Sequence, residues 1–213
     1  MRIQPLLVAA ALCLAATAAQ AALVITEVAS TSGAPAGTLE GLDWWELTNT
    51  GPAALSLDGY SWEDNPVSND RAIFPNGISV AAGESIIVHQ GSGIAAAFRS
   101  DWGLSAAVQV LDQDQFTGTN PFSGLSSGGD AVNLFDGANA AVASVTFPAS
   151  TAGRSFAWDT HGVSLGLSTL GVKGAYAASN NRVGSPGSAV PEPATLALLS
   201  LAACGLAGLR RRK

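Results

Sequence analysis

The chain has 213 residues, with 10 Lys and Arg against 16 Asp and Glu, and its mean hydropathy is +0.28. The apolar excess lies mostly at the two ends, whereas the middle, residues 22–190, carries 5 basic and 15 acidic side chains. A surface this acidic repels a phosphate backbone and contains no basic cluster, so nucleic-acid binding is not expected.

The N-terminus has the pattern of a secretory signal peptide. Arg2 supplies a charged start, residues 6–16 form an apolar run, and Ala19 and Ala21 place small side chains at positions −3 and −1 of a cut. We expect the secretion machinery to export the chain and signal peptidase to remove residues 1–21.

The C-terminus has the pattern of a short membrane segment. Pro191, Glu192 and Pro193 precede an apolar run, residues 194–209, and the chain ends with four basic residues. A helix of this run would be roughly 24 Å long, a little short of the ~30 Å hydrocarbon core of a bilayer. The basic end would stay on the cytoplasmic side, which places the rest of the chain outside. These basic residues are Arg210, Arg211, Arg212 and Lys213.

Three parts in this order resemble the PEP-CTERM sorting signal: the Pro-Glu-Pro triplet at residues 191–193, the apolar helix and the basic end. The resemblance implies that exosortase, a membrane-embedded transpeptidase of Gram-negative bacteria, recognises Pro191, Glu192 and Pro193 and cuts near them. The helix would then be a transient inner-membrane anchor that holds the domain in the periplasm before delivery to the cell surface or extracellular matrix. The residues alone leave open a permanent single-pass anchor, whose prolines only end the preceding coil and begin the helix.

Between the ends the sequence predicts an all-β domain. Short runs rich in Val, Ile, Trp and Phe alternate with clusters of Gly, Pro, Asn, Asp and Ser, and Cys13 and Cys204 both lie outside it, so no disulfide holds it together. One short helix is expected at 94–99, capped by Ser92 or Gly93. The pattern favours an immunoglobulin-like β-sandwich. The expected strands are residues 23–30, 44–49, 60–63, 72–74, 85–89, 107–111, 131–135, 141–147 and 155–158.

Two local features of these strands carry specific expectations. Asp136-Gly137 predicts a hairpin in which Gly137 adopts a positive φ. Successive strand residues face opposite sides of a sheet, so Trp44 and Trp45 point in opposite directions. We expect Trp45 to be the more deeply buried, and Trp44 to lie on the outer face or under a loop where its indole N–H finds a partner.

Seven segments of the middle resemble a lamin-tail domain. The resemblance implies an immunoglobulin-like sandwich over residues 22–159, closed by a Gly/Ser/Ala-rich segment and linker over 160–190. It also implies a structural or interaction module rather than an enzyme. Thr48 departs from the pattern, because an aromatic residue is common there. The segments that carry the resemblance are residues 24–28, 43–51, 57–64, 74–77, 80–85, 125–134 and 183–187.

One nucleophile motif occurs, with Ser164 at the centre of G-x-S-x-G and His161 close by. A small secreted serine hydrolase would need Ser164 on a turn from a buried strand into a helix, with a histidine in reach. No histidine follows Ser164, and His89, the other histidine, is expected at the rim of a strand. The motif is therefore interpreted as chance, and the hydrolase is kept as an alternative of a different class.

Two binding functions also remain open. Acidic loops suggest calcium, which takes six to eight oxygen ligands, although a solvated acidic surface explains them equally well. The candidate calcium ligands are Asp64, Asp70, Asp112 and Asp114. Aromatic side chains suggest stacking on an extracellular polysaccharide, the candidates being Trp44, Tyr60, Trp62 and Trp102. No cofactor is otherwise expected, and the partners would be the sorting peptidase and exopolysaccharide or surface proteins.

Overall fold

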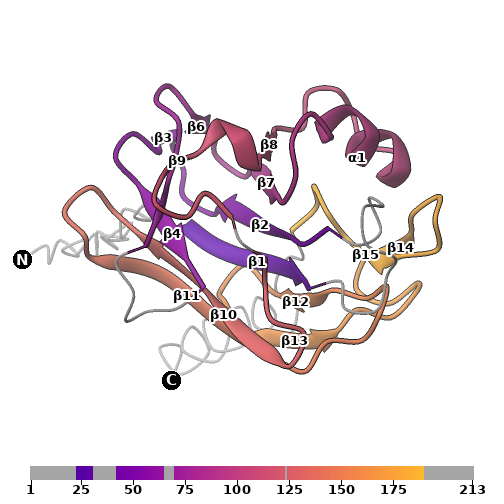
Figure 1. Ribbon diagram of the computed structural model, residues 1–213. Coiled ribbons are helices and arrows are strands. Elements are labelled where there is room, and N and C mark those ends of the chain that lie inside the picture. Colours follow the sequence, from indigo (N-terminus) through magenta and orange to yellow (C-terminus); the bar gives the residue numbers. More distant parts are fainter. Residues whose placement is uncertain (1–22, 31–41, 65–69, 123, 190–213) are drawn as a thin grey trace, which may run out of the picture.

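The computed structural model describes residues 23–30, 42–64, 70–122 and 124–189. These residues form two β-sheets packed face to face, two small two-stranded sheets and a short helix that lies outside the larger sheet (Figure 1). The expected signal peptide and sorting signal, with all their named residues, lie outside the described residues. Within the described part, no helix is long and apolar enough to cross a membrane.

The larger sheet has six strands in the order β13, β12, β1, β2, β7, β8. All neighbours are antiparallel except β7 and β8, which run parallel. The strands are β1 (Leu23–Ala29), β2 (Trp44–Asn49), β7 (Ser85–His89), β8 (Val110–Asp112), β12 (Phe156–Trp158) and β13 (Ser164–Leu167).

The smaller sheet has five antiparallel strands in the order β11, β10, β4, β5, β9. They are β4 (Ser61–Glu63), β5 (Ala72–Ile73), β9 (Thr117–Gly118), β10 (Gly129–Phe135) and β11 (Ala141–Pro148). The remaining elements are β3 (Leu55–Ser56) paired with β6 (Ser79–Val80), β14 (Tyr176–Ala177) paired with β15 (Val183–Gly184), helix α1 (Ala95–Trp102) and the 3-10 turn η2 (Gln113–Gln115).

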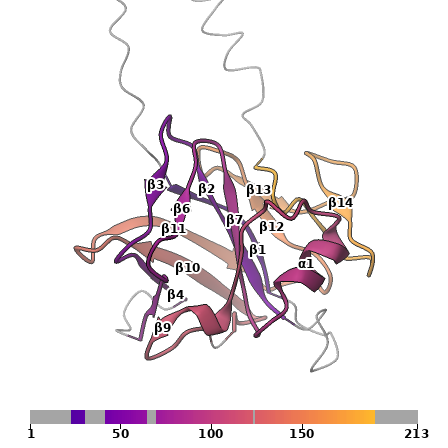
Figure 2. The same ribbon diagram turned by 90° about the horizontal axis from the view of Figure 1, so that it is seen from above.

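The predicted immunoglobulin-like sandwich is confirmed. Each of the nine expected strands overlaps a strand of the structure, and the expected helix at 94–99 corresponds to α1. The strands that the sequence did not predict are β13 and five two-residue strands, which are too short to show an alternating pattern. The expected closing segment contributes β13 to the edge of the larger sheet, and β14 and β15 to its outer side (Figures 1 and 2).

The hairpin between β10 and β11 forms where Asp136-Gly137 predicted it, but Gly137 does not supply the positive φ. Asn139 adopts it instead, with φ 63°. The Asp136 carboxylate accepts hydrogen bonds from the backbone N–H groups of Ala138 and Ala140, both at 2.9 Å. The aspartate therefore organises a longer turn, and the left-handed residue moves to a position that asparagine tolerates.

The main core lies between the two sheets. Trp45 meets Trp62 of the opposite sheet edge to face at 5.1 Å between ring centroids, and Phe74 at 6.3 Å. Such tilted aromatic pairs fill the space between the sheets without polar contacts. The inward position predicted for Trp45 is thereby confirmed.

The outer face of the larger sheet holds a second core. Trp44 lies on this face as expected, but the expectation that Trp45 is the more deeply buried of the two was wrong. Trp44 is as completely buried as Trp45, both with 0% exposed surface. Its ring packs against Phe98 and Trp102 of α1 at 5.5 and 5.8 Å. Its indole nitrogen has no hydrogen-bond partner among the described residues. Helix α1 therefore covers Trp44 with aromatic surface, where the sequence suggested a loop with a polar partner.

Replacing either tryptophan with alanine tests whether both faces of the larger sheet pack a buried core. We expect Trp44→Ala and Trp45→Ala each to lower the free energy of unfolding by about 3–5 kcal/mol, because each leaves a large cavity. Val163→Ala, at a side chain that is 59% exposed, should change it by less than about 0.5 kcal/mol. Urea unfolding measures all three, and a small loss for Trp44→Ala beside a full loss for Trp45→Ala would contradict the second core.

Candidate functional site

A pair of buried glutamates lies on the outer face of the larger sheet, beside the second core. Glu27 on β1 and Glu46 on β2 are direct cross-strand partners, and each is 1% exposed. The β1–β2 register passes from Ile25 opposite Leu47 to Glu27 opposite Glu46, so Thr26 is an extra residue in a β-bulge. This bulge lets the side chains of both Thr26 and Glu27 reach the same polar layer.

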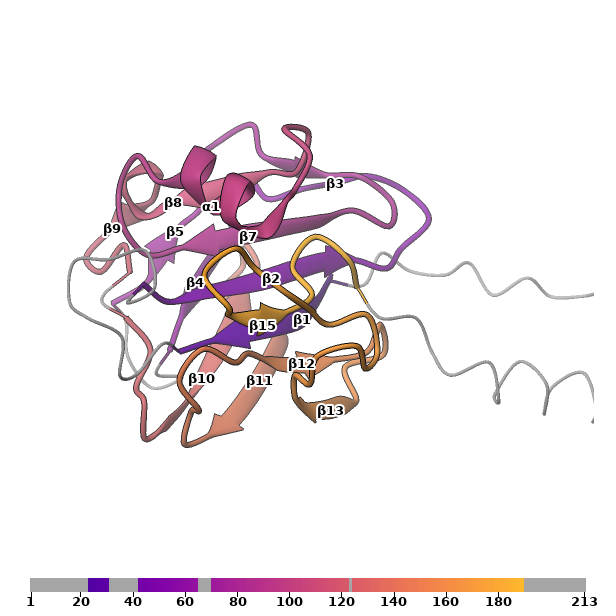
Figure 3. The ribbon, with the colours of Figure 1, turned by 90° about the vertical axis from the view of Figure 1, so that its right-hand side faces the viewer.

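The last described segment of the chain covers these carboxylates. We call residues 183–188, which are β15 and the turn that follows it, the C-terminal strap. Figure 3 shows β15 lying across β1 and β2, below α1. The strap is fixed at its start by the Val183 N–H, which donates to the Gly153 carbonyl at 2.8 Å.

Glu27 receives hydrogen bonds from both sides. The Ser155 hydroxyl donates to Oε1 of Glu27. The strap residue Ser185 donates its backbone N–H to both carboxylate oxygens, at 2.8 and 3.1 Å, and its hydroxyl to Oε2 at 3.1 Å. Ser155 also contacts the Ser168 hydroxyl at 2.7 Å, which extends the network toward β13.

Glu46 has a similar set of donors. The Thr26 hydroxyl donates to Oε1 at 2.5 Å, and the backbone N–H of Gly187 in the strap donates to Oε2 at 2.5 Å. Thr26 continues through Thr48 to Ser85 by hydroxyl contacts of 2.8 and 2.7 Å. The strap thus closes the polar layer by offering two N–H groups and one hydroxyl to two carboxylates.

Burial changes the acidity of this pair. Desolvation, followed by the charge of Glu46, raises the pKa of Glu27 to about 8. Desolvation also raises the pKa of Glu46 to about 7, against the lowering effect of Thr26 and Gly187. Desolvation and the two glutamates raise the pKa of nearby Tyr176 to about 12. At neutral pH the pair therefore keeps at least one proton, because two adjacent buried charges are costly.

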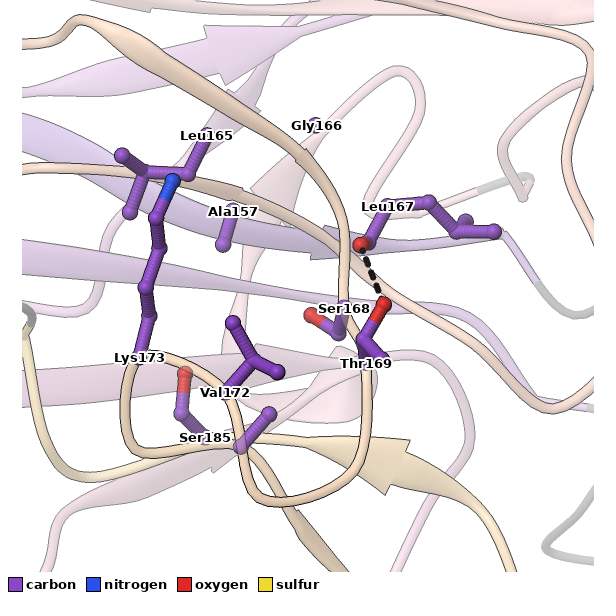
Figure 4. A pocket seen from close by; sticks show the side chains of 10 residues that line it. Ala157, Leu165, Gly166, Leu167, Ser168, Thr169, Val172, Lys173 and Ser185 are labelled. Atoms are coloured by element: carbon purple, nitrogen blue, oxygen red, sulfur yellow. Dashed lines mark hydrogen bonds between the residues drawn. The ribbon is translucent and has the colours of Figure 1, made fainter.

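A solvent-open pocket adjoins the buried pair (Figure 4). Ser168 and Ser185, whose hydroxyls belong to the Glu27 network, line it together with Thr169, and Lys173 extends along its side. The pocket is a shallow polar recess between β13 and the strap.

Two of the calcium candidates organise the start of α1. Asp112 accepts hydrogen bonds from the backbone N–H groups of Ile94 and Ala95, at 3.1 and 3.3 Å. The Ser92 hydroxyl donates to Asp114 at 2.5 Å. The N-cap residue is Ile94, so the expected capping by Ser92 or Gly93 is wrong. A carboxylate from the neighbouring β8 satisfies the helix terminus instead.

The other two calcium candidates, Asp64 and Asp70, flank β4 and β5 of the smaller sheet. Asp112 ends β8 of the larger sheet, with Asp114 in the turn after it. The described ranges contain no group of three or more His, Cys, Asp or Glu side chains placed to hold a metal ion. Calcium binding stays a prediction.

Ser164 does not occupy a nucleophile elbow. It begins β13, opposite Trp158 in a hairpin with β12, and its exposed hydroxyl accepts the Gly166 N–H at 3.3 Å. His161 lies in the hairpin turn, where its backbone N–H donates to the Asp159 carboxylate at 2.9 Å. The turn joins two strands, whereas the hydrolase motif requires a strand followed by a helix.

His89 was expected at a rim and is instead completely buried on β7. Its ring meets Phe98 of α1 at 4.8 Å, and Nδ1 contacts the Gln90 carbonyl. Burial lowers the pKa of His89 to about 4, so the ring is neutral in the folded protein. The neutral His89 ring is therefore a packing element of the second core, in contact with Phe98.

Three of the four aromatic residues suggested for sugar stacking are not available for it. Trp44, Trp62 and Trp102 are all at most 3% exposed, and Tyr60 packs partly buried against the main core. Stacking on a sugar ring requires an exposed aromatic face, so the expectation for the three tryptophans is wrong.

Sequence reasoning did not select Glu27 and Glu46 as a site. Both lie within segments that resemble a lamin-tail domain, residues 24–28 and 43–51. A usable signal was present, because an acidic residue in the middle of each of two neighbouring apolar strands needs a buried partner if both sheet faces are covered. The sequence does not show that the outer face is covered, or that Ser185 and Gly187 supply the donors.

The buried pair predicts a pH dependence of stability with a definite sign. In the unfolded chain both carboxyls titrate near pH 4.5, so up to about pH 8 the folded protein holds more protons. The free energy of unfolding therefore falls as pH rises through this window. Below about pH 6.5, His89 acts in the opposite direction because its folded pKa is lowered to about 4.

Urea unfolding at a series of pH values from about 7.5 to about 9 separates the glutamate contribution from that of His89, because the unfolded-state histidine is almost fully deprotonated there. We expect stability to fall across this range, and to fall less in Glu46→Gln, which removes one charge of the pair. Glu84→Gln, the same change at a partly exposed carboxylate, should behave as the unaltered protein does. A stability that rises or stays constant over the range would contradict a buried protonated pair.

The strap also predicts a strict requirement for glycine at position 184. A methyl group there would lie 2.5 Å from Glu27 Oε1 and 2.9 Å from Ser155 Oγ. We expect Gly184→Ala to cost about 1–3 kcal/mol through overpacking. Gly137→Ala is the matched control, because its added methyl meets nothing closer than 3.8 Å. Equal stability of the two variants, measured by thermal or urea unfolding, would show that the strap is loosely seated.

Comparison with known families agrees with both resemblances seen in the sequence. The PEP-CTERM protein-sorting motif matches residues 189–213, which implies exosortase-dependent sorting of an exported protein. No match was found among curated proteins. The Lamin Tail Domain matches residues 16–149, more than half of the chain. The chain therefore belongs to the Lamin Tail Domain family.

Proposed function

We propose that this protein is a non-catalytic structural or interaction module of the cell surface or extracellular matrix. An exosortase-type transpeptidase releases it from the inner membrane through its C-terminal signal. The observation that carries the proposal is the junction at residue 188. The strap closes the folded domain there, and the match to the sorting motif begins at the next residue.

The surroundings of Ser164 support the non-catalytic role. Its hydroxyl lies on an exposed hairpin strand. Of the two histidines, His161 lies in the hairpin turn and His89 is buried in the second core. The partner of the mature module is proposed to be exopolysaccharide or another surface protein, and the broadly acidic surface suits an extracellular setting.

Intact-mass measurement of the mature protein tests the sorting step. In cells that contain the sorting peptidase, we expect the protein from outer fractions to lack both residues 1–21 and the basic end, Arg210 to Lys213. Without the peptidase, the chain should keep its C-terminus and remain with the membrane. Glu192→Ala should give the same membrane-retained chain in the presence of the peptidase.

Retention of the basic end in protein from the outer fractions would overturn the proposal. That result would favour a permanent anchor.

A further inference from the structure

The strap connects the buried glutamate pair to the segment that the sorting peptidase must reach. Gly187, whose N–H is held by Glu46, precedes Pro191 by four residues. Four extended residues reach at most ~14 Å, so a seated strap keeps the triplet close to the folded domain. If residues 183–188 detach from the sheet, Arg182 is the last attached residue and Pro191 follows it by nine residues. An extended chain of that length reaches ~30 Å.

The donors that hold the end of the strap all point at the two carboxylates. The Ser185 N–H and hydroxyl bind Glu27, and the Gly187 N–H binds Glu46. These hydrogen bonds stabilise one ionised carboxylate of the pair. None of the three donors carries a positive charge, so they do not neutralise a second ionised carboxylate on the adjacent strand. Full ionisation of the pair therefore opposes burial under the strap, and opening the strap admits water to both carboxylates.

We propose that the strap is a proton-controlled latch on the sorting signal: a protonated Glu27–Glu46 pair keeps it seated, which limits how far the triplet can reach from the domain, and ionisation of both carboxylates releases it and gives the peptidase access. This proposal rests on the proposed function, because it assigns a control to the same sorting step. The released proton goes to water, and no covalent bond changes.

Other charged and titratable groups lie near the pair. Tyr176 stays protonated in this range because its pKa is about 12, and His89 stays neutral because its pKa is about 4. Arg154 donates to the Ser168 carbonyl, and Asp101 accepts from Ser179 at the α1 side. Other cations of the surrounding elements are Arg182, Lys173 and Arg99 of α1, whose guanidinium donates to the Val108 carbonyl at 2.8 Å. Tyr176 and His89 therefore keep their charge states near neutral pH, and a transition there is assigned to the glutamates.

Glu46→Gln should keep the strap seated at all pH values tested. The Gln oxygen still accepts the Gly187 N–H, and its amide can donate to the Thr26 hydroxyl, which then turns toward Thr48. Gly184→Ala should have the opposite effect, because the added methyl collides with Glu27 and Ser155. The two variants therefore bias the latch in opposite directions.

Hydrogen exchange measured by mass spectrometry on the full chain in detergent tests the seating. After correction for the intrinsic exchange rate, we expect protection of residues 183–188 to fall by about tenfold or more between about pH 6 and pH 9. In Glu46→Gln the fall should be much smaller, and Glu84→Gln should match the unaltered chain. Peptides from β10 and β11 should stay protected throughout. Constant strap protection in the unaltered chain, or an equal fall in Glu46→Gln, would overturn the latch.

The rate at which cells with the peptidase remove the basic end tests the consequence. We expect Gly184→Ala to be processed several-fold faster than the unaltered chain and Gly137→Ala. Raising the medium from about pH 6.5 to about 8.5 should speed processing of the unaltered chain but not of Glu46→Gln, which controls for the pH response of the peptidase. Equal rates in all variants, with processing intact, would overturn the latch and leave the sorting proposal standing. If no chain is processed, the sorting proposal itself fails, and the latch loses its role whatever the exchange data show.

Discussion

The larger sheet has no solvent face along β1 and β2, and most features of the molecule depend on this constraint. Its inner face packs on the smaller sheet, and its outer face is covered by α1 and the C-terminal strap. Every side chain on these strands must therefore be apolar or find a buried partner. The ring of Trp44 packs against apolar aromatic residues of α1. Glu27 and Glu46 are polar and accept hydrogen bonds from buried donors of the strap.

The two halves of this outer cover differ in chemistry. Helix α1 contributes apolar burial, which does not depend on pH near neutrality because His89 stays neutral there. The strap contributes hydrogen bonds to a carboxylate pair whose second ionisation is costly. Removing either partner of such a buried network leaves the other unsatisfied, so a small change at Gly184 or Glu46 has a larger effect than a change on the exposed hairpin. Of the two covers, the strap is therefore the one whose seating we propose to depend on proton concentration near neutral pH.

This arrangement gives the C-terminal signal a structural context. The chain does not run from the domain into a loose linker at residue 160, because β13, β14 and β15 continue the fold as far as the strap. The sorting motif begins directly after the last hydrogen-bonded turn. The short chain between Gly187 and Pro191 is what would couple seating of the strap to the reach of the motif in the proposed latch.

The sequence by itself determined the sandwich, because alternating apolar residues and turn residues repeat through nine runs whose spacing allows few other folds. It also determined the C-terminal sorting signal, since recognition of that signal depends on order and composition, and it predicts the signal peptide. Only the tertiary structure decided which polar residues form a site. Strand periodicity assigns Glu27 and Glu46 to a face, but whether that face meets water depends on segments far away in the chain. Residues 185 and 187 lie more than 135 positions from these glutamates, and no local pattern encodes that contact.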